Sequence, residues 1–150
     1  MTLRLAALLA LACVPAPAVI AQEIRAAQSL PARPLTITGK HKPIHFKVEV
    51  AKTERQQEIG LMFRKTMPAD HGMIFPMVPE RMATFWMRNT YLPLDMVFIR
   101  TDGTISSIAP NVKPLSDDIT GSFEPVAAVL ELNAGAAAKA GIKPGDKVRW

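Results

Sequence analysis

The feature that most constrains the fold is a pair of short segments, 94–99 and 104–109, joined by Asp102-Gly103. The first segment is apolar at every position except Asp95, which is typical of a strand buried on both faces. Asp-Gly is favoured in tight hairpin turns because both positions tolerate positive φ. The sequence therefore predicts an antiparallel hairpin that contains one fully buried strand.

Other short segments carry the same kind of pattern. Thr53 and Gln56 have the spacing of a capping box, which predicts a short helix over about 53–63. Asn133 is expected to cap a second, Ala-rich helix that ends at Gly141. Alternating or continuous apolar runs predict further strands at residues 44–50, 72–75, 83–87, 126–132 and 148–150.

Together these elements predict the fold class. The chain has 150 residues, of which 49% are hydrophobic, as expected for one soluble domain. The strands do not alternate with helices in the manner of a parallel α/β protein. We therefore expect an α+β fold that is mainly β, a small antiparallel barrel or rolled sheet of six to eight short strands with two short helices.

Residues 1–21 have the pattern of an export signal. Arg4 precedes an apolar run from Leu5 to Ala12, which is too short to span a bilayer. Small residues follow, and cleavage is expected after Ala21, although an uncleaved membrane anchor is the alternative. The protein is then periplasmic or secreted without a stable membrane span, and the single cysteine, Cys13, is lost with the signal.

The remaining chain divides into a linker and one domain. Residues 22–34 lack apolar periodicity and contain Pro31 and Pro34, so they are expected to be a linker, and a single β-rich domain follows over 35–150. The net charge of +5 comes from basic residues interspersed with acidic ones, without aromatic residues among them. This distribution favours a solvated surface and argues against a nucleic-acid partner.

Several consecutive motifs also carry a resemblance. They are Gly60-Leu61-Met62-Phe63-Arg64, Gly72-Met73-Ile74-Phe75, Phe85-Trp86-Met87-Arg88-Asn89-Thr90, Pro93-Leu94-Asp95 and the segments 129–135 and 141–146. Their order and spacing resemble the widespread prokaryotic family called domain of unknown function 192, over about residues 44–150. The resemblance implies a compact β-rich domain that is often exported, and it brings no activity with it.

Polar side chains within apolar strands are the first candidate site. Asp95 begins one buried run and Glu131 interrupts another, while Asn89-Thr90 ends the segment that contains Trp86. A buried carboxylate is costly unless it is hydrogen-bonded or paired. Each acid is therefore expected to cap backbone N–H groups or to pair with Arg64 or Arg88. If the two acids converge instead, they could perform general acid/base catalysis.

Methionines are the second candidate site. Seven of the eight lie between Met62 and Met96, with His71 among them. Thioethers and an imidazole could bind Cu(I), but the gaps of 4 to 9 residues do not match the tight spacing of copper sites. Methionine also fills cores and lines adaptable binding surfaces. His41 and His45 lack a third ligand nearby, so no metal site is expected there.

The leading hypothesis is an exported, non-catalytic module that binds a small molecule or an envelope protein in a groove near Trp86. It requires no cofactor. The expected ligand-binding residues are Trp86, Met87, Asn89, Asp95 and Glu131. Two alternatives remain open: a hydrolase that uses Asp95 and Glu131, and a methionine-rich Cu(I)-binding protein.

Overall fold

The computed structural model describes residues 26–40 and 42–150. The predicted signal segment, its cleavage site and Cys13 lie outside these residues. The described strands are β1 (Ala32–Thr38), β2 (Ile44–Val50), β3 (His71–Arg81), β4 (Thr84–Phe85), β5 (Leu94–Ile99), β6 (Ile105–Val112), β7 (Thr120–Gly121), β8 (Val126–Asn133) and β9 (Lys147–Arg149). The described helices are α1 (Glu54–Ile59) and α2 (Ala136–Ala140).

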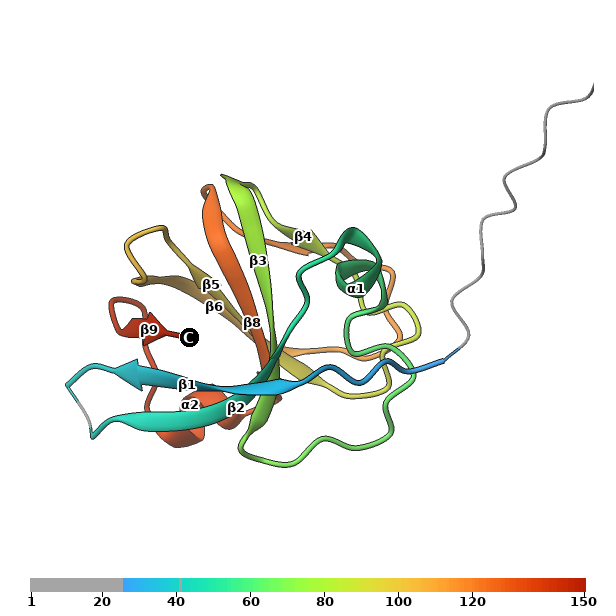
Figure 1. Ribbon diagram of the computed structural model, residues 1–150, viewed down its shortest axis with the longest axis horizontal. Coiled ribbons are helices and arrows are strands. Elements are labelled where there is room, and N and C mark those ends of the chain that lie inside the picture. Colours follow the sequence, from blue (N-terminus) through green and yellow to red (C-terminus); the bar gives the residue numbers. More distant parts are fainter. Residues whose placement is uncertain (1–25, 41) are drawn as a thin grey trace, which may run out of the picture.

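Seven strands form one sheet in the order β6-β5-β8-β3-β2-β1-β9, and β4 and β7 form a separate pair. The large sheet curls until β9 at one edge meets the start of β6 at the other (Figure 1). There, Ile105 N–H donates to the Asp146 carbonyl at 2.8 Å, and Val148 N–H donates to Gly103 O at 2.8 Å. The fold is thus mainly β, a curled sheet with two short helices, as expected from the sequence.

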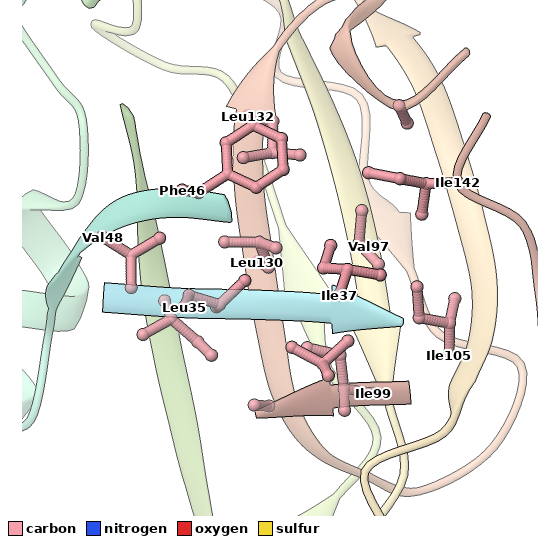
Figure 2. Packing of buried hydrophobic residues seen from close by; sticks show 14 residues of the cluster. Leu35, Ile37, Phe46, Val48, Val97, Ile99, Ile105, Leu130, Leu132 and Ile142 are labelled. Carbon is pink, nitrogen blue, oxygen red and sulfur yellow. The ribbon is translucent and has the colours of Figure 1, made fainter. Parts of the chain in front are cut away.

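The two faces of the sheet carry separate cores. On one face, aliphatic side chains from all the large strands, such as Leu35, Val97 and Leu130, pack against Ala137 of α2 (Figure 2 shows the strand residues). On the opposite face, Phe75, Met96 and neighbouring residues pack beneath the chain that follows α1 and β3. Because side chains alternate along a strand, the central strands β3, β5 and β8 contribute to both cores.

The hairpin and the capping box are confirmed. Strand β5 covers residues 94–99, is buried throughout and pairs antiparallel with β6, and Gly103 has φ of 81°. Thr53 Oγ1 accepts from Gln56 N–H, and the Gln56 side chain accepts from Thr53 N–H. The helix ends at Ile59 rather than 63 because Gly60, with φ of 49°, leaves the helical conformation.

Three features differ from the sequence-based expectation. Strand β1 begins at Ala32, inside the segment predicted to be a linker, and Pro34 fits there because β9 pairs only with residues 36–38. Strands β2 and β3 pair in parallel across α1, so the chain contains one β-α-β unit after all. Strand β3 runs through Pro76, where its pairing with β2 has already stopped at Ile74.

The helices of this fold are short. Helix α1 has six residues and α2 has five. Within residues 26–40 and 42–150, no helix is long and apolar enough to cross a membrane.

Candidate functional site

A pocket of about 440 Å³ lies between α1, the end of β3, and β4. This volume is within the range of small-molecule sites. Its lining residues come from helix α1 and the turn after it, from β3 and β4, and from single positions on the chain beyond; they are Gln57, Glu58, Ile59, Gly60, Leu61, Met62, Phe75, Met77, Arg81, Met82, Ala83, Thr84, Phe85, Trp86, Thr90, Ile119 and Glu131. Most of these side chains are apolar, as in many pockets for small organic ligands.

Local interactions hold α1 against β3 and so keep one wall of the pocket in place. The Gln57 side-chain amide donates to Pro76 O at 2.7 Å and to Ala51 O at 3.2 Å. Gly60 then brings the chain close to Phe75: a Cβ at this position would lie 3.3 Å from the Phe75 ring, and its positive φ also favours glycine. The capping box therefore marks a helix that forms part of a site, which the sequence pattern alone did not reveal.

Glu131 is the most buried of the ionisable residues that line this pocket. It lies on β8, its neighbours in register are Met73 on β3 and Met96 on β5, and only 5% of its surface is exposed. Its carboxyl group has no hydrogen bond or ion pair to any described residue, although it lines the pocket. Burial raises the pKa of Glu131 to about 8.

This placement determines what Glu131 can do. Near neutral pH the carboxyl is mostly protonated, so it can donate a hydrogen bond as well as accept one. A ligand that brought a cation or several donors would stabilise the ionised form instead. A buried acid without a protein partner is costly to keep, which makes it a candidate for a functional group.

Trp86 lies at the opening of the pocket. Its side chain is 45% exposed, and the Arg88 guanidinium lies 4.3 Å from the centroid of its ring. Arg88 is fixed by Asp117, whose Oδ1 accepts from Nε at 2.9 Å. The structure thus brings Trp86 and Glu131, two of the five expected ligand-binding residues, to the same pocket.

Met87 and Asn89 take other places. The Met87 side chain is 1% exposed, packs in the core and does not line the pocket. Asn89 has φ of 57°, a conformation that asparagine tolerates better than most residues, and its carbonyl accepts from Phe63 N–H at 2.8 Å. These two residues shape the turn after Trp86 and do not contact the pocket.

Asp95 has a structural role. Its carboxylate accepts hydrogen bonds from the N–H groups of Asn111, Gly135 and Ala137 at 2.9, 3.0 and 3.0 Å, and so it caps the start of α2. The prediction that Asn133 caps α2 is wrong. The Asn133 side chain donates to Met67 O and Pro68 O instead, and the N-cap residue of α2 is Gly135. The reason is non-local, because Asp95 already satisfies the N–H groups that Asn133 would have served.

The two acids of the hydrolase hypothesis are not brought together. Glu131 pairs in register with Met96, and Asp95 pairs with Leu132. Since paired residues point to the same face and sequence neighbours to opposite faces, the Asp95 and Glu131 side chains lie on opposite sides of the sheet. A catalytic carboxylate pair across one cleft does not fit this arrangement.

A buried ion pair lies nearby and was missed at the sequence level. Arg64 donates to both carboxylate oxygens of Glu49, at 2.6 and 2.8 Å, and to Gln28 O at 2.8 Å. Burial raises the pKa of Glu49, but hydrogen bonds from Arg64 and from Leu30 N–H outweigh it, so the net pKa is below its ordinary value. Arg64 was expected to neutralise one of the other acids; Glu49 was overlooked because it occupies a polar position of an alternating strand.

The methionines are distributed over core and pocket. Met73 and Met87 are buried in the core, whereas Met62, Met77 and Met82 line the pocket. No group of three or more His, Cys, Asp or Glu side chains suited to a metal is found within residues 26–40 and 42–150. The soft thioethers at the pocket give it an adaptable apolar wall.

The comparison with known proteins gives the family. The model of DUF192, whose description reads "Uncharacterized ACR", matches residues 35–150. The chain belongs to this family. A crystal structure of a candidate transcription regulator from Sinorhizobium meliloti 1021 is 44% identical, with a TM-score of 0.78, and the match covers 83% of this chain and 97% of that one.

A second solved structure has a similar identity and TM-score. It is a protein of unknown function from Novosphingobium aromaticivorans DSM 12444, 43% identical with a TM-score of 0.80, and the match covers 88% of this chain and 94% of that one. No curated protein matches the chain. The likeness therefore establishes the family and the fold of this DUF192 protein.

Proposed function

We propose that this DUF192 protein is an exported, non-catalytic module that binds a small organic molecule in the pocket between α1 and β3. The observation that carries the proposal is Glu131, a buried carboxyl group that lines the pocket and has no hydrogen-bond partner among the described residues. A bound ligand would supply that partner. Export rests on the sequence of residues 1–21 and is part of the proposal.

The pocket wall supports a ligand with an apolar body. Phe75 and Phe85 pack edge to face with centroids 5.2 Å apart, and Met77 lies beside them. Trp86 can cover the ligand at the opening because almost half of its surface is exposed. Two acids line the pocket: Glu131 is buried, whereas Glu58 is exposed and accepts from Arg55. A pair of buried catalytic acids is therefore not found among the described lining residues, which favours binding over hydrolysis.

A role in reading DNA, which the description of the S. meliloti protein suggests, finds less support. The helices of residues 26–40 and 42–150 have six and five residues, too short to present a recognition helix to the major groove. The exposed basic side chains are paired with acids at several places, as in Arg88–Asp117 and Lys147–Asp102. Binding of a small molecule remains the proposal.

The test is a fragment screen that contains neutral, cationic and anionic compounds. The protein carries Trp150→Phe, so that Trp86 is the only tryptophan and its fluorescence reports on the pocket opening. We expect saturable hits that shift Trp86 emission. A matched variant with Thr84→Phe, which fills the pocket from an exposed position on β4, should lose them.

Two results would contradict the proposal: no saturable hit from any class of compound, or hits that bind the Thr84→Phe variant equally well. Circular dichroism of both proteins is the control that tests whether the substitution alters the fold.

A further inference from the structure

The environment of Glu131 also indicates the class of ligand, an inference that rests on the proposed function. We propose that the pocket binds an organic cation, a primary ammonium group on an unbranched apolar chain, with the ammonium at the Glu131 carboxylate. The chain would lie along Phe75 and Met77 toward Trp86.

The first argument is the number of donors that Glu131 lacks. Its carboxylate can accept several hydrogen bonds, and no described residue donates one. An ammonium group supplies three donors and a full opposite charge, whereas an alcohol supplies one donor and no charge. Because Glu131 is only 5% exposed, that opposite charge is worth more beside it than in bulk solvent.

The second argument is that no cation of the protein occupies this place. Arg64, which follows α1, binds both oxygens of Glu49. Glu49 pairs in register with Met73, which in turn pairs with Glu131, so the two acids are two strands apart, about 10 Å. Both terminal nitrogens of Arg64 are therefore engaged by Glu49 and Gln28, and within the described residues only its buried Nε has no hydrogen-bond partner.

The other charged groups that face the pocket lie toward its opening. Arg81 pairs in register with Val126, five residues along β8 from Glu131, which corresponds to about 16 Å. Its guanidinium donates to Gln57 Oε1 at 3.4 Å. Glu58 accepts from Arg55 at 3.2 Å on the exposed side of α1. On β5 the neighbour of Glu131 is the neutral Met96. The deep end of the pocket thus holds a single ionisable group.

The third argument is the wall. Aromatic faces and thioethers are polarisable, and the faces of aromatic rings attract cations. The pair Phe75–Phe85 and the exposed ring of Trp86 provide such faces. A carboxylate ligand would instead meet the like charge of Glu131 once that group is ionised. The wall and the acid together select a cation with an apolar chain.

The test is calorimetric titration with three compounds of equal chain length: hexylamine, 1-hexanol and hexanoate. At pH 9 the amine is still protonated and Glu131 is ionised, so hexylamine should bind at least about 10-fold more tightly than 1-hexanol. With the Glu131 pKa at about 8, hexylamine affinity should fall about 30-fold between pH 9 and pH 6.5. Titrations in two buffers of different ionisation enthalpy should show nearly one proton released per amine bound at pH 6.5.

Two variants separate the carboxyl group from general effects of pH. Glu131→Gln should remove the preference for the amine and the pH dependence, and Glu80→Gln, an exposed glutamate outside the pocket, should leave both unchanged. If Glu131→Gln does not fold, the proton count in the unmodified protein decides the matter. A further titration with Nα-acetyl-lysine methylamide distinguishes two sources of the ammonium group. This compound represents the lysine side chain of a protein, whereas hexylamine represents a free amine.

Equal affinity for 1-hexanol and hexylamine, or hexylamine binding that survives Glu131→Gln, would overturn the choice of a cation. In that case fragments that still bind at Trp86 would leave the proposed function standing. If neither the fragments nor any hexyl compound binds, both proposals are wrong.

Discussion

Replacement of Glu131 by glutamine should change how the stability of the fold depends on pH. An unfolded glutamate has a pKa of 4.5, and burial raises the pKa of Glu131 to about 8 in the folded protein. The folded state therefore holds a proton that the unfolded state releases between these two values. The stability is fully present below pH 4.5 and decreases as the pH rises toward 8, the opposite of the usual acid effect.

The size of this decrease follows from the shift. A difference of about 3.5 pKa units corresponds to about 4 kcal/mol in the free energy of unfolding between pH 4.5 and pH 9. Because glutamine does not titrate, the Glu131→Gln variant should not show this pH-dependent decrease in the free energy of unfolding. Its stability relative to the unmodified protein should rise by that amount across the same range. The absolute difference at one pH is less informative, since glutamine also buries an unpaired amide.

The assay is urea unfolding at intervals of one pH unit from 4.5 to 9, followed by tryptophan fluorescence and far-ultraviolet circular dichroism. Other groups, such as Glu49 with its lowered pKa, titrate equally in both proteins and cancel in the difference. Parallel stability curves for the two proteins would refute the reasoning. They would mean that Glu131 is solvated or paired in the fold, and the argument for a ligand at that carboxyl would fall with it.

Three further substitutions test the structural roles. Asp95→Asn removes the charge that accepts three backbone N–H groups and should lower the free energy of unfolding by about 3–5 kcal/mol; an unchanged urea midpoint would contradict the cap of α2. Glu49→Gln leaves the buried Arg64 charge without its partner and should cost about 3–5 kcal/mol, measured in the same way, with a loss below about 1 kcal/mol arguing that the pair is solvated. Gly72→Ala places a Cβ 2.5 Å from the Glu131 carbonyl oxygen, which should separate β3 from β8 and lower the free energy of unfolding by about 1–3 kcal/mol. A thermal midpoint equal to that of the unmodified protein would contradict this steric conflict.

Much of the fold could be predicted because its signals are local. Alternation of side chains defined β2, an uninterrupted apolar run defined β5, and Asp102-Gly103 defined the turn that follows it. Strand β1 was missed because its three exposed residues and Pro34 hide the two buried positions, Leu35 and Ile37. The parallel pairing of β2 with β3 was missed because partners across a crossover leave no local pattern.

The candidate site was predicted only in part. Trp86 and Glu131 were selected as polar or aromatic exceptions in apolar segments, and both line the pocket. Asp95 was selected by the same rule, yet its carboxylate caps α2. The same pattern, a charged residue within an apolar run, therefore selected both Glu131, which lines the pocket, and Asp95, which caps a helix. A sequence pattern indicates that a charged side chain is buried but not which groups surround it.

The sequence by itself determined where the strands run, where the hairpin turns, and that the acids at positions 95 and 131 are buried, because these follow from side-chain periodicity and turn chemistry within a few residues. Only the tertiary structure decided that the two acids face opposite sides of the sheet and that α1 packs over β3 to form a pocket. The physical reason is that strand register and helix placement depend on contacts between residues far apart in the chain. Those contacts gave Asp95 three N–H partners and placed Glu131 in the lining of a pocket, without a hydrogen-bond partner among the described residues.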